Sequence, residues 1–108
     1  MQDNMEDTRP LGITPFDPDV LTTGDYAKPK AVPLKTLEES AEMVEATKDW
    51  LKAGRPDGEL RTRMLDEMAD VLQTVANQCA AFGIPDDELY EALRRCETRN
   101  RDRGRITG

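Results

Sequence analysis

The chain has 108 residues, of which 37% are hydrophobic and 5% aromatic, and its 22 Asp and Glu outnumber 15 Lys and Arg. This length suits one domain with a core small enough that we expect self-association, and the acidic balance argues against binding to nucleic-acid duplexes. With no histidine and only Cys79 and Cys96, a zinc site or a Cys–His nucleophile is not expected.

Residues 1–33 form the first segment and hold five of the seven prolines. Proline interrupts helices, so we expect an irregular or partly disordered arm with no helix longer than a turn or two. Four residues of this arm could pin it onto a partner surface: Phe16, Val20, Leu21 and Tyr26. Disorder of at least the first ten residues is an equal alternative.

Residues 34–99 have the pattern of a helical domain with three helices. The first helix ends at residues 54–56, the second begins around residues 57–59 and ends at Gly83, and the third opens after Pro85. No strand-like alternation is present, so we predict an all-α, antiparallel helical bundle completed by homo-oligomerisation. Residues 100–108 follow as a basic tail, because the last 15 residues carry six arginines against two acidic residues.

The first predicted helix has an unusual distribution of side chains around its axis. One apolar stripe runs along it, formed by Leu37, Ala41, Val44 and Leu51. A second apolar patch on another side is formed by Met43, Ala46 and Trp50. Between the two lie four acidic residues: Glu38, Glu42, Glu45 and Asp49. Like charges bracketed by apolar surface repel one another, and a cation or hydrogen bonds would relieve that repulsion.

Two carboxylate pairs form the most informative motif: Glu39 with Glu42, and Glu67 with Asp70. Each pair is spaced i, i+3, so in a helix its two carboxylates lie on one face, one turn apart. The connector rich in Gly and Pro between the pairs is expected to fold the two helices antiparallel. Four converging carboxylates would form an all-oxygen site that suits Mg²⁺ or Mn²⁺. A solvated acidic face is the alternative.

The segments EESAEMVEA and DEMADVLQTVANQ, joined by a short connector, resemble the ExxE…ExxD signature of the MazG-like, all-α nucleoside triphosphate pyrophosphohydrolases. The resemblance covers roughly residues 34–105. It implies that Mg²⁺, or Mn²⁺, binds Glu39, Glu42, Glu67 and Asp70. It also implies that Glu38 or Glu45 holds a second ion or orients water. The general base would be Glu38, Glu42 or Glu45, or hydroxide bound to the metal. Family members usually assemble from two or more subunits.

The C-terminal segment RNRDRGRI also resembles the end of many small relatives of this family. This resemblance implies Asn100, Arg103 and Arg105 as phosphate-binding residues, with a basic, frayed helix end as the alternative. Because an aromatic side chain often lies near the base in the family, Trp50 is the candidate for stacking, with a core position as its alternative. Typical members have another helix before ExxE, and in this chain the proline-rich arm takes that place.

From these features we expect a Mg²⁺-dependent hydrolase that releases pyrophosphate and a nucleoside monophosphate from a nucleoside triphosphate or a related phosphate substrate. The expected assembly is a homodimer or homotetramer. No apolar run approaches the roughly 20 residues of a membrane span, and the polar, acidic start does not resemble a signal peptide, so we expect a cytoplasmic location. The alternatives are a non-catalytic acidic helical interaction module and a nucleotide-binding regulator without hydrolysis.

Overall fold

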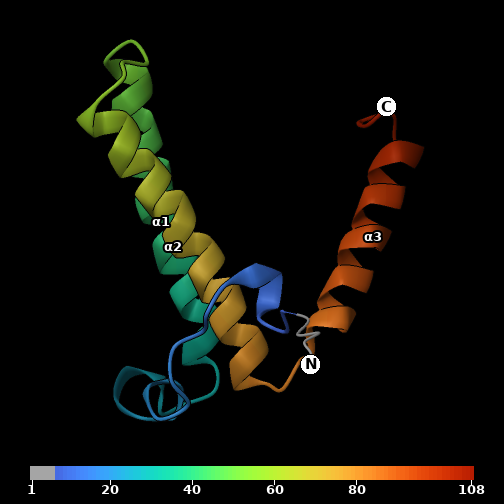
Figure 1. Cartoon of the computed structure of the whole chain (residues 1–108). Coiled ribbons are helices and arrows are strands. Elements are labelled where there is room, and N and C mark those ends of the chain that lie inside the picture. The colour runs from blue at the N-terminus through green and yellow to red at the C-terminus, as the bar shows by residue number, and fades with distance from the viewer. Residues whose placement is uncertain (1–6) are drawn as a thin grey trace, which may run out of the picture.

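The computed structural model describes residues 7–108, which form an open V of helices (Figure 1). The helical hairpin of α1 (Ala31–Lys52) and α2 (Glu59–Ala81) is one limb of the V, and α3 (Asp86–Asp102) is the other. No strand occurs within residues 7–108, which confirms the all-α prediction. The radius of gyration is 16.8 Å, against about 13 Å for a compact domain of 100 residues. No helix in the described part of the chain is long and apolar enough to cross a membrane.

The helix boundaries follow local chain chemistry. α1 begins at Ala31, before the predicted boundary at residue 34, because Pro33 falls in its first turn. A proline there removes no helical hydrogen bond, since the first N–H groups of a helix have no intrahelical acceptor. Beyond the C-terminus of α2, Gly83 adopts a φ of +66°, and Pro85 precedes α3, both as predicted. α3 continues to Asp102, so the predicted basic tail begins inside this helix.

α1 packs on α2 through its second apolar patch rather than through the longer stripe. Val32 and Ala46 are 2% and 0% exposed, and Met43 and Trp50 are half-buried on the same side of the helix. The large members of the stripe remain exposed in the single chain: Leu37 at 67%, Val44 at 51% and Leu51 at 45%. The small side chain of Ala46 lets the two helix axes approach, and this favours the second patch as the contact face.

The N-terminal arm follows a defined path across α2 from residue 7 onward, while residues 1–6 of the predicted disordered start lie outside the described residues. It contains three single turns of 3-10 helix, η1 (Pro10–Gly12), η2 (Val20–Thr22) and η3 (Gly24–Tyr26), in agreement with the predicted irregular arm. Of the four predicted anchors, Leu21 is buried, Tyr26 is half-buried, and Phe16 and Val20 stay exposed.

Asn77 of α2 fixes this arm in place. Its side chain is 2% exposed, and its Oδ1 accepts the backbone N–H of Phe16 at 2.9 Å and the Nε2 of Gln73 at 3.1 Å. The same Nε2 of Gln73 donates to the carbonyl of Thr14 at 3.0 Å. These bonds satisfy the buried amide and the arm backbone together, so the arm is held by polar contacts as well as by Leu21.

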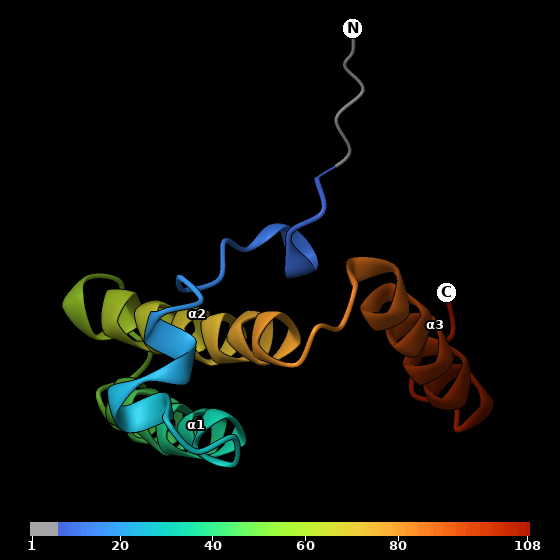
Figure 2. The same ribbon diagram turned by 90° about the horizontal axis from the view of Figure 1, so that it is seen from below.

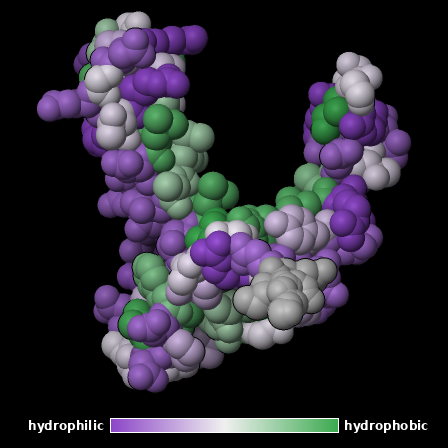
Figure 3. Space-filling model, viewed as in Figure 1, coloured by the Kyte–Doolittle hydropathy of each residue, from purple (hydrophilic) through white to green (hydrophobic). Residues whose placement is uncertain are grey.

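α3 joins the rest of the molecule chiefly at its first turn. There the backbone N–H of Leu11, in η1, donates to Oδ1 of Asp86 at 3.2 Å. Figure 2 shows α3 pointing away from the hairpin beyond this turn. Along the hairpin side that faces α3, and at the base of α3 itself, the surface is apolar (Figure 3). The V is therefore lined by side chains that favour further packing.

Replacing Asn77 with Leu is expected to weaken the fold by about 1–3 kcal/mol, because the N–H of Phe16 loses its acceptor at a partly buried position. Urea unfolding followed by circular dichroism measures this loss. Gln73→Ala, which removes only partly exposed bonds, is the comparison variant and should cost less. Equal stability of Asn77→Leu and the unmodified chain would show that the arm does not depend on this amide.

Candidate metal centre

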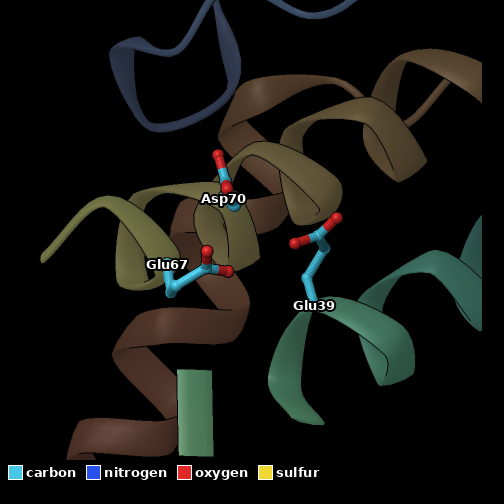
Figure 4. A group of neighbouring side chains, drawn as sticks. All are labelled: Glu39, Glu67 and Asp70. Atoms are coloured by element: carbon cyan, nitrogen blue, oxygen red, sulfur yellow. The ribbon is translucent and has the colours of Figure 1, made fainter. Parts of the chain in front are cut away.

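Three of the four predicted metal ligands come together in the seam between α1 and α2. Glu39 of α1 and Glu67 and Asp70 of α2 each offer a carboxylate oxygen, and these oxygens all lie within 4.8 Å of one another. Figure 4 shows Glu39 and Glu67 pointing toward each other across the two helices, with Asp70 one turn from Glu67. The i, i+3 spacing and the antiparallel hairpin produce this arrangement, as the sequence predicts.

The seam buries part of this negative charge without compensation. Oε2 of Glu39 and Oε2 of Glu67 are buried, and neither has a hydrogen-bond partner among the described residues. A buried carboxylate oxygen without a partner is costly, and a second one nearby adds repulsion. A cation or a proton is needed to relieve this cost. Carboxylate oxygens are the ligands that a hard divalent cation such as Mg²⁺ prefers.

The pKa of Glu39 in this seam is raised to about 7. The largest cause is a hydrogen bond shared with the Glu42 side chain, which requires a proton; burial comes next, followed by the charges of Glu42, Asp70 and Glu67. The pKa of Glu67 is also raised, first by burial and then by the charges of Glu42 and Asp70. Without a cation, the seam therefore retains a proton that an ordinary glutamate would release.

Glu42 thus belongs to the same group of acids, although its oxygens are not within the converging set of three. Its side chain is exposed beside Glu39, as the i, i+3 spacing requires. The two predicted catalytic residues lie elsewhere on α1. Glu38 forms an ion pair with Lys35 at 3.7 Å, and Glu45 forms one with Lys48 at 3.5 Å. Each pair joins two side chains of the same helix, one turn apart.

Arg63 lies beside these acids, and it was not predicted from the sequence as a residue of the site. It precedes Glu67 by one helical turn, and its charge opposes the rise in the pKa of Glu67. Its Nη1 donates to Oδ2 of Asp49 on α1 at 2.7 Å. Both Arg63 and Glu67 line an open surface pocket of about 530 Å³ at the start of α2. The spacing of Arg63 before Glu67 is the signal that could have identified it.

Trp50 lies at the turn of the hairpin, eleven residues beyond Glu39 on α1. Its Nε1 donates to the carbonyl of Pro56 at 2.9 Å, and the guanidinium of Arg61 lies 5.9 Å from the ring centre. At 1.5 Å per residue, about 16 Å of helix separates it from Glu39. The structure therefore does not bring Trp50 into the acidic cluster.

The C-terminal residues predicted to bind phosphate lie at the end of α3. Asn100 donates to Sγ of Cys96 at 3.5 Å and accepts Nη1 of Arg105 at 3.1 Å, while Arg103 is exposed. Within one copy these residues lie on the other limb of the V from the carboxylates (Figure 1). A single chain therefore does not combine the basic residues with the acidic cluster.

Comparison of the chain with protein families, with curated proteins and with solved structures finds no match.

The raised pKa of Glu39 predicts how the stability of the metal-free protein depends on pH. The folded state keeps a proton on Glu39 up to about pH 7, whereas an ordinary glutamate loses it near the reference value of 4.5. The folded state thus binds more protons between these values, so the free energy of unfolding should fall as the pH rises from 4.5 through 7. Chemical unfolding in EDTA across this range measures the effect.

Glu39→Gln should flatten this part of the profile and make the protein more stable than the unmodified chain at pH 8. Glu45→Gln, an exposed glutamate on the same helix, is the control and should leave the slope in place. An unchanged slope in Glu39→Gln would show that Glu39 ionises normally.

Proposed function

We propose that the chain is a Mg²⁺-dependent nucleoside triphosphate pyrophosphohydrolase. The observation that carries the proposal is the convergence of Glu39, Glu67 and Asp70 within 4.8 Å, with two buried oxygens that lack a partner. Such a cluster is costly as a structural element and becomes favourable with a divalent cation. The resemblance of both carboxylate pairs to the MazG-like signature supports the same reading and supplies the substrate class.

In this proposal Glu39, Glu67 and Asp70 hold the ion, with Glu42 completing the set from its position beside Glu39. All donors are carboxylate oxygens, which favours Mg²⁺, or Mn²⁺, over zinc. When bound, the ion supplies the positive charge that an acidic site needs to accept a polyphosphate, and it makes a nearby water more acidic.

The remaining groups bind and orient the substrate. Hydrolysis adds water across the phosphoanhydride bond that links the α and β phosphates. The products are a nucleoside monophosphate and pyrophosphate. Arg63 lines the pocket beside Glu67 and offers a planar guanidinium to phosphate oxygens. Among the candidate bases Glu38, Glu42 and Glu45, the position of Glu42 beside Glu39 favours it for taking the proton of the water, because the other two pair with lysines.

We also infer that the working form is a homodimer or homotetramer in the cytoplasm. Exposed large apolar side chains occur on all three helices, including Leu37, Leu72 and Leu93 at 67%, 49% and 44%. A single chain leaves them in water, and association would bury those on α1 and α3. It would also allow Asn100, Arg103, Arg105 and Trp50 of the same or another copy to contribute to substrate binding.

Pyrophosphate release from a panel of ribo- and deoxynucleoside triphosphates tests the activity. We expect release with Mg²⁺ or Mn²⁺ and none in EDTA. Asp70→Asn and Glu67→Gln should each abolish turnover with little change in circular dichroism, because they remove ligands without removing packing. Asp57→Asn, in the connector between α1 and α2, is the control. Turnover by Asp70→Asn that still requires the metal would contradict the assignment.

Binding of the ion itself is tested by thermal unfolding. At 100 times its dissociation constant, Mg²⁺ should stabilise the fold by about 2.7 kcal/mol, because it binds only the folded arrangement. The shift should be lost in Asp70→Asn and kept in Asp57→Asn. A shift without turnover would indicate a nucleotide-binding regulator. No shift at any concentration would favour the non-catalytic interaction module.

A further inference from the structure

α1 has two opposite apolar faces, and the chain covers only one of them. The face with Val32 and Ala46 packs on α2. At about 100° per residue, the other face points directly away from α2. We call it the outer row; it consists of Leu34, Leu37, Val44 and Leu51, which are 51%, 67%, 51% and 45% exposed. A helix with two apolar faces is stable in water only between two packing partners.

The chain cannot cover the outer row with its own third helix. Only residues 82–85 connect α2 to α3, and they form the turn that ends α2, in which Ile84 donates to the carbonyl of Cys79 at 2.9 Å. From Ala81 to Asp86 the chain makes five Cα–Cα steps, at most about 18 Å when fully extended, and the turn at Ile84 shortens this reach. A helix on the far side of α1 would have its axis roughly 16–20 Å from that of α2. With the turn in place the connector is too short, so we look for the partner of the outer row in another chain.

α3 has the surface that the outer row requires. Leu89, Leu93 and Cys96 share one face of α3, which packs against the rest of the molecule chiefly at its first turn, and Leu93 is 44% exposed. A helix of 17 residues without a packing partner is marginal in water. Arg99 and Arg103 flank this apolar face, and neither forms an ion pair among residues 7–108.

The charges along the two surfaces are complementary. Glu38 and Glu45 lie one heptad apart along one edge of the outer row, and among residues 7–108 their ion pairs are with lysines of the same helix, at 3.7 and 3.5 Å. The lysine that pairs with Glu45 is Lys48, which lies within the row and is 67% exposed. An apolar row edged by acids on α1 thus matches an apolar row edged by arginines on α3. Charge matching of this kind selects a partner and fixes its orientation.

We propose that α3 of a second copy of this chain packs along the outer row of α1, and that the second copy receives α3 of the first in return. The exchange explains why α3 points away from its own hairpin and why α1 is apolar on both sides. It forms a closed, two-fold interface. This inference concerns assembly and does not depend on the proposed hydrolysis.

Sedimentation or light scattering of the full chain tests the interface. We expect a dimer or a larger even assembly, and expect Val44→Asp to weaken association at least about a hundredfold. Leu72→Asp on α2 is the matched control, because Leu72 is 49% exposed against 51% for Val44. A monomeric unmodified chain at micromolar concentrations would overturn the proposal. Dissociation by Leu72→Asp with intact association of Val44→Asp would also overturn it, by moving the interface to α2.

Charge exchange tests whether α3 is the partner element. The double variants Glu38→Arg with Glu45→Arg, and Arg99→Glu with Arg103→Glu, should each be monomeric alone, because like charges then face each other. Mixed in equal amounts, they should associate again, since both reciprocal contacts regain opposite charges. Helicity measured by circular dichroism confirms that each variant folds. Failure of the mixture to associate, with both variants folded, would overturn the assignment of α3.

Discussion

Negative charge held in the seam of the α1–α2 hairpin is the constraint on which the rest of this structure depends. Glu39 and Glu67 are carried by helices that also pack through Val32, Ala46 and Met64. The carboxylates therefore cannot separate without loss of the apolar contacts beside them. Such an arrangement lowers the stability of the folded chain when nothing neutralises the charge. It also raises the affinity of the folded chain for a group that does neutralise it. A proton can take that role, and in the proposed function a divalent cation would compete with it.

The two helices of the hairpin carry different groups. α2 carries two of the three converging acids, the amide that holds the arm, and Arg63 beside the pocket. α1 contributes Glu39 and Glu42 and presents a second apolar face to the outside. One side of the hairpin thus carries the converging acids, and another carries an exposed apolar row. The division explains how a chain this short carries both a polar site and an extended apolar surface.

The sequence predicted the helices and the convergence of their acids well, because both depend on short-range spacing. Gly83, Pro85 and the i, i+3 carboxylates act within a few residues; the structure places Gly83 and Pro85 as expected and brings three of the four carboxylates together, with Glu42 outside the converging set. The choice of contact face on α1 was not predictable in this way. Both faces are apolar, and which one meets α2 depends on the fit around Ala46 rather than on periodicity. The position of α3 could not be predicted from periodicity either, because the periodicity of a sequence describes one helix at a time.

The path of the arm depends on partners far away in the sequence, and this has a consequence for folding. Phe16 bonds to Asn77 and Leu11 to Asp86, across 61 and 75 residues. The hairpin, by contrast, closes across a six-residue connector and forms from local contacts. Closing a long loop costs chain entropy that only a formed α2 can offset, so we expect the arm to attach last. During synthesis the arm then leaves the ribosome before the hairpin does, and finds its place after it.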